Sequence, residues 1–435
     1  MAMTVATIPA PAFAIETFRL ANGLRVVLAP DPGAPVVGVA VVYDVGMRSE
    51  PEGRTGFAHL FEHMMFQGSH NVGKAEHMRH VQSAGGTFNG STHIDYTDYF
   101  NLLPSGGLEL ALFLEADRMR GPAITEENLE NQVSVVKEEI RVNVLNRPYG
   151  GFPWLKLPPV MFDTFPNAHD GYGSFGDLEA ATVDEAQAFF DAFYPASNAV
   201  LSVAGDFTVE TARDLVERHF GDVPARPAPV HPSFAEPNLD AERRESYVDE
   251  RATLPAVAMA WRIPDPVTEL AEFLPYVVLG ELLTDGDASR LVERLVHRDR
   301  VATAVAAHAT FMAEPFASRG PTALLIQAFL PPGGDVDTVM AGVHEELARV
   351  AEGVDEAELG RVKARVAAQL LRSDDSVMGR SRRLATAEVF HGDATMATRF
   401  AVLLGEVTAE SVARAAAALT PNRRAVIEVV PGGNQ

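Results

Sequence analysis

Two histidines and a glutamate follow the pattern His-x-x-Glu-His at His59, Glu62 and His63. If residues 56–68 form a helix, these three side chains share one side of it. The opposite side is apolar: Phe57, Leu60, Phe61 and Met64. Two imidazoles one helical turn apart can bind one metal ion, and the glutamate beside them can take a proton from bound water. The pattern indicates a hydrolytic zinc site; the alternative is a solvated face of an amphipathic helix.

A catalytic zinc needs a third protein ligand, and a second predicted helix over residues 126–145 offers one. Its apolar stripe consists of Leu129, Val133, Val136, Ile140 and Val144. Glu138 points away from this stripe and Glu139 flanks it, so Glu139 is the preferred ligand, because a ligand must face protein. Gln132 lies two turns earlier on the same side and can hydrogen-bond a ligand. The alternative is that the polar side chains of this helix, Glu139 and Gln132 among them, face solvent and bind no metal.

A polar, β-prone stretch is the candidate substrate-binding element: Asn89, Gly90, Ser91 and Thr92. An edge strand of this kind can hydrogen-bond an extended peptide through its backbone and leave side-chain recognition permissive. The alternative is a glycine-punctuated hairpin with a structural role only.

The chain divides at a proline-rich run, Pro224–Pro237, which has five prolines in fourteen residues and is incompatible with a helix. Strand-like patterns recur on its two sides: residues 35–41 resemble 255–261, and residues 195–203 resemble 421–429. Repeats in the same order indicate gene duplication. We therefore expect three parts: a zinc-binding domain at 1–223, a linker at 224–240, and a homologous domain without the zinc motif at 241–435.

The alternation of strand-like and helical patterns predicts the fold class. Strands are expected at 25–28, 36–43 and 199–203, and helices at 108–120, 126–145 and 183–193. This pattern is typical of an α+β fold. Each of the two homologous domains should be a mainly antiparallel sheet backed by helices.

Composition excludes several classes of function. The chain of 435 residues has no cysteine, which excludes disulfides and thiolate metal sites. Its net charge of −23 argues against a nucleic-acid partner; it favours basic peptides as substrates or simply keeps the protein soluble. No stretch is apolar for long enough to span a membrane. The N-terminus lacks a basic region before Arg19, which predicts a cytoplasmic protein, with periplasmic or secreted export as the alternative.

The His-x-x-Glu-His pattern, followed by Glu139 in a V-V-x-x-E context, resembles the pitrilysin/insulinase family of zinc metallopeptidases, in particular its mitochondrial-processing-peptidase-like branch. The resemblance runs through the segments 22–24, 56–68, 85–92 and 135–139 and the duplicated second half. It implies that two histidines and one glutamate bind one zinc ion per chain: His59, His63 and Glu139. It also implies that Glu62 is the general base, and that this chain forms one half of a clam-shell chamber enclosing peptides. Many members have a glutamate where this chain has Gln132.

The second half lacks the residues for a metal site. Alignment of the repeats places Val278, Glu281 and Leu282 where the first half has its motif. In the family, the zinc-free side often supplies an arginine and a tyrosine after a Ser-Arg-Leu helix start. This chain has that start at residues 289–291, but the matching positions are Val296 and Thr303.

The resemblance therefore predicts a zinc-dependent endopeptidase that cleaves peptides or short unfolded polypeptides. We expect a heterodimer with a related zinc-free subunit that supplies the arginine and tyrosine, with a homodimer as the alternative. A noncatalytic assembly subunit of the same fold is the second hypothesis. A different zinc hydrolase with the same ligands is the third.

Overall fold

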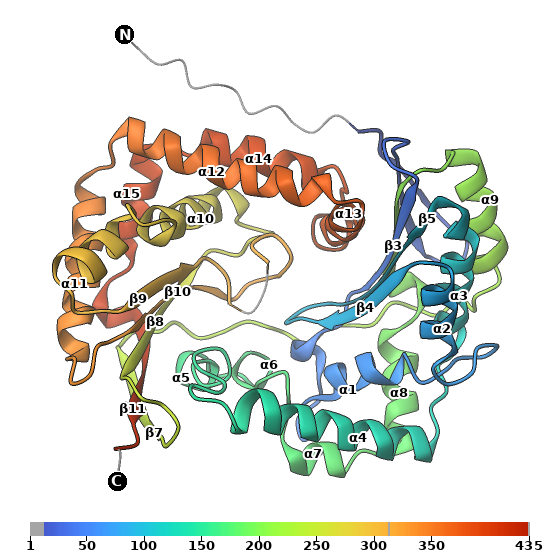
Figure 1. Cartoon of the computed structure of the whole chain (residues 1–435), viewed down its shortest axis with the longest axis horizontal. Coiled ribbons are helices and arrows are strands. Elements are labelled where there is room, and N and C mark those ends of the chain that lie inside the picture. The colour runs from blue at the N-terminus through green and yellow to red at the C-terminus, as the bar shows by residue number, and fades with distance from the viewer. Residues whose placement is uncertain (1–12, 312–313, 434–435) are drawn as a thin grey trace.

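The structure is a computed structural model that describes residues 13–311 and 314–433. Two sheets stand at opposite ends of the molecule, with helices between and around them (Figure 1). The first sheet contains β1 Glu16–Arg19, β2 Arg25–Pro30, β3 Val36–Tyr43, β4 Thr87–Thr92, β5 Thr97–Pro104 and β6 Ala199–Gly205. The second contains β7 Arg243–Asp249, β8 Ala256–Ile263, β9 Ala304–His308, β10 Thr322–Phe329 and β11 Arg424–Pro431.

The two sheets repeat one topology. The first has the order β1-β2-β6-β3-β5-β4, and the second has the order β7-β11-β8-β10-β9. In each, one pair is parallel, β2 with β6 and β7 with β11, and the remaining pairs are antiparallel. The predicted fold class, two α+β units with mainly antiparallel sheets, is confirmed. The domain limits and the linker at 224–240 remain a proposal, and those linker residues form no helix or strand.

Fifteen α-helices surround the sheets in the described residues. The first half contains α1 Phe57–Met64, α2 Glu76–Ser83, α3 Leu108–Arg120, α4 Glu126–Ile140, α5 Pro158–Met161, α6 Phe165–Ala168, α7 Phe175–Glu179, α8 Val183–Phe193 and α9 Val209–Phe220. The second contains α10 Leu270–Thr284, α11 Val336–Glu352, α12 Glu356–Asp375, α13 Val377–His391, α14 Met396–Glu406 and α15 Ala409–Ala418. The predicted helices at 108–120 and 183–193 match α3 and α8. The helix predicted at 126–145 ends as α4 at Ile140 and continues as a π-helical turn, Arg141–Leu145.

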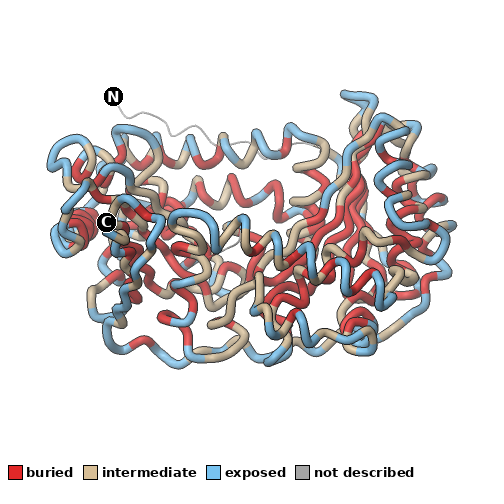
Figure 2. The backbone as a smooth tube through the Cα atoms, turned by 60° about the horizontal axis from the view of Figure 1, so that its bottom comes forward, coloured by how far each residue is buried: buried red, intermediate tan, exposed pale blue. Residues whose placement is uncertain are grey.

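Each sheet is covered partly by the other half of the chain. Helix α13 lies against the inner face of β3 and β6 (Figure 1), where Leu384 and Val389 share a buried cluster with Val42 and Val200. Reciprocally, Leu157 and other residues around α5 pack in one cluster with strands β8, β10 and β11. The buried residues follow both sheets and the helix faces turned toward them (Figure 2). The sequence pattern predicts helices behind each sheet. It does not predict that each half covers the sheet of the other half, because the amphipathic pattern of a helix does not identify the surface on which it packs.

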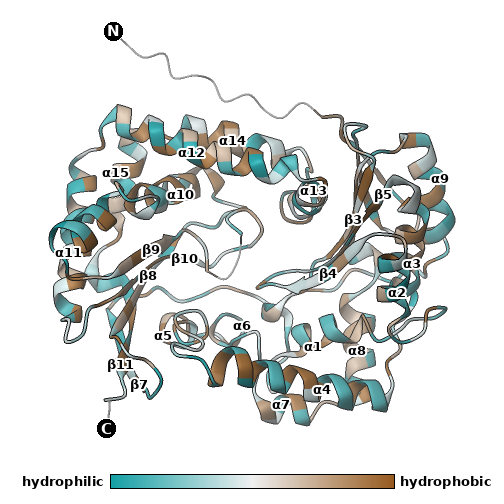
Figure 3. Cartoon of the chain, in the orientation of Figure 1, coloured by the Kyte–Doolittle hydropathy of each residue, from teal (hydrophilic) through white to brown (hydrophobic). Residues whose placement is uncertain are grey.

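No helix in the described part of the chain is both long and apolar enough to cross a membrane. Apolar residues concentrate in the central strands and in α10, whereas the outer helix α9 has many hydrophilic residues (Figure 3). Residues 1–12, which include much of the segment behind the expectation of a cytoplasmic location, lie outside the described residues.

Candidate metal centre

The helix that carries the motif, α1, packs with its predicted apolar face inward. Phe57, Leu60, Phe61 and Met64 are each at most 2% exposed. Phe57 and Phe61 pack with the first sheet and α8, and Leu60 and Met64 pack with α4. These contacts fix the rotation of the helix about its axis. His59 and Glu62 are therefore left at the wall of a cavity between α1, β4 and the loop around Tyr172, and His63 lies beside His59.

Helix α4 brings Glu139 to the two histidines. Glu139 Oε2 lies 3.8 Å from His59 Nε2 and 3.4 Å from His63 Nε2. One ligand atom from each residue lies within 4.8 Å of the others, and this is the one such group among the described residues. Tetrahedral zinc with bonds of about 2.0–2.1 Å holds its nitrogen and oxygen ligands roughly 3.4 Å apart. The donor set and its spacing thus fit a zinc ion with one coordination position left open.

The neighbouring glutamate takes no part in this group. Glu138 is 63% exposed and pairs with Arg141, while Glu139 is 31% exposed and faces α1. The apolar stripe of α4 turns Glu139 inward, since Leu129, Val136 and Ile140 are buried against α1. Gln132, also on α4, is buried and contributes a hydrogen bond that raises the pKa of His63.

The electrostatics of the three residues favour a cation. Burial lowers the pKa of His59 to about 4, so this imidazole is neutral at pH 7. Burial acts in the same direction on His63, but the Glu139 carboxylate outweighs it and raises the pKa of His63. The hydrogen bond from His63 in turn lowers the pKa of Glu139. The carboxylate that raises the pKa of His63 can equally balance the charge of a metal ion.

Glu62 faces the cavity beside this group. Its Oε2 accepts a hydrogen bond of 2.7 Å from the Thr92 hydroxyl. Burial raises the pKa of Glu62 despite this hydrogen bond. A Cβ on Gly90 would lie 3.2 Å from Glu62 Cγ and 3.1 Å from a ring carbon of Phe66. Strand β4 can therefore pass close over Glu62 because it carries a glycine at that point.

The predicted substrate-binding residues lie on β4, the outermost strand of the first sheet. Gly90, Ser91 and Thr92 line a cavity of about 310 Å³ together with His59 and Glu62, whereas Asn89 does not. The Ser91 hydroxyl also lies 3.0 Å from Nη2 of Arg382, a residue of α13. The second half of the chain thus reaches the strand next to the metal group.

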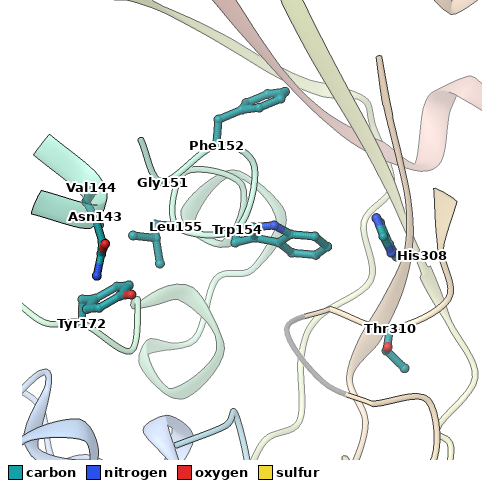
Figure 4. Close-up of a pocket in the computed structure, with 9 residues that line it drawn as sticks. All are labelled: Asn143, Val144, Gly151, Phe152, Trp154, Leu155, Tyr172, His308 and Thr310. Carbon is teal, nitrogen blue, oxygen red and sulfur yellow. The ribbon is translucent and has the colours of Figure 1, made fainter. Parts of the chain in front are cut away.

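A second cavity, of about 500 Å³, adjoins the first through Tyr172 (Figure 4). The Tyr172 ring packs edge-on against His59, with ring centroids 5.3 Å apart. Trp154, another lining residue, packs edge-on against His308 of β9, with ring centroids 5.2 Å apart. None of the lining residues is aspartate, glutamate, lysine or arginine: Asn143, Val144, Gly151, Phe152, Trp154, Leu155, Tyr172, His308 and Thr310. Motif spacing does not reveal Tyr172 and Trp154, because they lie on loops.

The second half has no equivalent site among its described residues. In α10, Val278 and Leu282 are buried in the core, and Glu281 has no histidine beside it. Arg290, from the Ser-Arg-Leu segment, pairs with Glu358 within the same half.

Two family models match this chain: "Insulinase (Peptidase family M16)" over residues 25–148 and "Peptidase M16 inactive domain" over residues 180–366. The zinc protease PqqE of Helicobacter pylori is 29% identical over 299 residues, which are 67% of this chain and 66% of that protein.

Two solved structures show the same fold. A protease from Helicobacter pylori superposes with a TM-score of 0.88 at 23% identity, over 97% of this chain and all of that one. The periplasmic protease PqqL of Escherichia coli gives a TM-score of 0.76 at 18% identity, and the match covers 97% of this chain but 48% of PqqL. Because residues 25–148 and residues 180–366 are each matched by a model of the same family, the chain belongs to the insulinase family of peptidases, family M16.

Proposed function

We propose that this protein is a zinc-dependent endopeptidase of peptides or short unfolded polypeptides. The observation that carries the proposal is the convergence of His59, His63 and Glu139 from two helices, with Glu62 at the same cavity. Bound zinc would supply a Lewis acid that polarises a peptide carbonyl and makes water a better nucleophile.

Glu62 would move the protons of the reaction. Its Oε2 is held by Thr92, which leaves Oε1 to take a proton from the attacking water and to return it to the leaving amine. A raised pKa suits a group that must both accept and release a proton near neutral pH. His59 and His63 stay in place because α1 is packed on its opposite face.

Strand β4 would bind the substrate as an added strand. It pairs with β5 on one side and is the last strand of its sheet, so its other edge can accept an extended peptide next to Glu62. The uncharged cavity around Trp154 lies close enough to take a substrate side chain. It favours an apolar side chain over the basic one suggested by net charge alone, because it offers no carboxylate to pair with a cation.

We also propose that a related, zinc-free subunit completes the chamber, with a second copy of this chain as the alternative partner. PqqL, of which this chain matches about half, fits a chamber built from two such units. The described second half offers Val296 and Thr303 where the family has its arginine and tyrosine, so these groups must come from the partner.

Metal analysis combined with Glu62→Gln tests the catalytic proposal. We expect about one zinc per chain in both proteins and cleavage of unstructured peptides by the wild type only. Retained cleavage by Glu62→Gln would remove Glu62 as the base. Absence of zinc and of cleavage, with or without a partner, would instead favour the noncatalytic assembly subunit, for which the "inactive domain" match over residues 180–366 leaves room.

Co-purification tests the partner. We expect the tagged chain to capture a protein of similar size without the His-x-x-Glu-His motif, and we expect this protein to raise peptidase activity. Full activity of the chain alone, unchanged by products of neighbouring genes, would contradict the proposal.

A further inference from the structure

The metal helix α1 has no cap of its own at the N-terminus. Gly56 precedes it with φ 85° and has no side chain to accept from the first amides, and the first turn contains no acidic residue. A Cβ on Gly56 would lie 2.5 Å from the carbonyl oxygen of Tyr172, which excludes a capping side chain at this position. The first amides of a helix have no acceptor within it, so α1 needs one from elsewhere.

Glu50 supplies that acceptor from the preceding turn. Its Oε2 accepts a hydrogen bond of 2.8 Å from the Gly56 amide, and its Oε1 accepts one of 2.7 Å from the Ala58 amide. The side chain is fully buried. A negative charge is favourable at a helix N-terminus, where the peptide dipoles point their positive ends. Two amides on two oxygens fix both the position and the direction of the turn that leads into His59.

His169 supplies the counter-charge. Its Nε2 lies 3.1 Å from Glu50 Oε2 and 2.9 Å from the Met47 carbonyl oxygen, and its Nδ1 lies 2.7 Å from the Phe165 carbonyl oxygen. Backbone carbonyls only accept, so each ring nitrogen must carry a proton. His169 is therefore an imidazolium. Burial alone lowers the pKa of His169, but Glu50 and the two carbonyls raise it above its usual value.

We infer that Glu50 and His169 form a positioning ion pair that sets the orientation of the metal helix. The pair lies at the N-terminal end of α1, and neither residue lines the cavity. It acts on the ligands through the backbone of the first turn. It also anchors the loop that continues to Tyr172, whose ring packs against His59. His59 is thus held from two sides by one buried pair. This role in metal binding rests on the proposed zinc site, whereas the cap itself does not.

Hydrogen exchange of the metal-free protein tests the cap. In Glu50→Gln, an amide group replaces one accepting oxygen and faces a backbone donor. We expect exchange in peptides spanning residues 54–64 to become about tenfold faster. The matched control is Glu346→Gln, which removes another buried, ion-paired carboxylate in the second half and should leave these peptides unchanged. If Glu50→Gln does not fold, His169→Gln provides the same test by removing only the counter-charge.

Zinc affinity, measured by competition with a chromophoric chelator, tests the positioning role. We expect Glu50→Gln and His169→Gln to bind zinc about tenfold more weakly than wild type and Glu346→Gln to bind it equally well. Unchanged exchange in α1 would overturn the cap. Faster exchange with unchanged zinc affinity would overturn the positioning role. If wild type binds no zinc but exchange responds as expected, the cap stands and the proposed catalytic function fails.

Discussion

Replacement of Asp95 by asparagine should destabilise the protein far more than the loss of an ordinary ion pair. Arg48 and Asp95 form a bidentate pair with N–O distances of 2.8 and 2.6 Å, and both side chains are 1% exposed. Arg48 also donates to the carbonyl oxygens of Arg319 and Pro321 and to the Asn167 side chain. All five donors of the guanidinium are thus used, and two of them join the halves of the chain.

The burial of this pair determines the size of the effect. An asparagine keeps the shape of Asp95 but leaves the Arg48 cation buried without a counter-charge, which costs about 3–5 kcal/mol. The amide of Arg319, which donates to Asp95 Oδ2 at 2.7 Å, loses a charged acceptor as well. Substitution of both partners by apolar residues should not restore stability, because the carbonyls that Arg48 satisfies would then lack donors.

Equilibrium unfolding in urea, followed by circular dichroism, measures this effect. The matched control is Asp163→Asn, which breaks a pair with Arg243 of similar bidentate geometry, with N–O distances of 2.8 and 2.9 Å, on the surface. Its partners are 34% and 40% exposed, so the loss should stay below about 1 kcal/mol. Equal destabilisation by Asp95→Asn and Asp163→Asn would refute the reasoning that burial makes the Arg48 pair essential.

Three further changes test the site. Thr92→Val keeps the side-chain shape but removes the hydrogen bond to Glu62. It should lower kcat at least tenfold with unchanged zinc content, because a hydrogen bond to a charged group contributes about 1.5–3 kcal/mol. A fall in zinc content instead would show that Thr92 supports the metal group. Trp154→Ala should reduce the preference for an aromatic over an alanine side chain by about tenfold in competition assays, and an unchanged preference would remove the larger cavity from substrate recognition. His169 has a raised pKa, so its stabilisation is fully present below the ordinary imidazole pKa of about 6.5 and is lost as pH rises through the higher folded-state value. The difference in Tm between wild type and His169→Gln should therefore shrink from pH 6 to pH 9, and a difference that grows with pH would contradict a cationic His169.

Residues whose role depends on helical periodicity were predictable from the sequence. The 3.6-residue repeat places His59, Glu62 and His63 opposite the buried face of α1, and it distinguishes Glu139 from Glu138. The strands at 36–43 and 199–203 follow from mainly apolar runs, because a strand in the middle of a covered sheet is buried on both faces.

Residues whose role depends on contacts between distant segments were not predictable. His169 lies 119 positions from Glu50, and nothing in the local pattern of either residue indicates the other. One signal was available: the helix predicted at 56–68 begins at a glycine, so its first amides require a distant acceptor. The packing of α13 on β3 could likewise not be predicted from the sequence. The amphipathic pattern of a helix in the second half is compatible with packing on either sheet.

The two halves share a sheet topology, but among the described residues only the first half contains a candidate metal group. In the first half, β4 passes over α1 at Gly90 and leaves a cavity above Glu62. In the second half, the matching positions on α10 are filled by Val278 and Leu282, which are buried and extend the core. A helix without metal ligands can bury side chains on all of its faces, and most residues of α10 are buried. The second half also places α13 and Arg382 against the sheet of the first half, next to the candidate metal group, and His308 at the larger cavity.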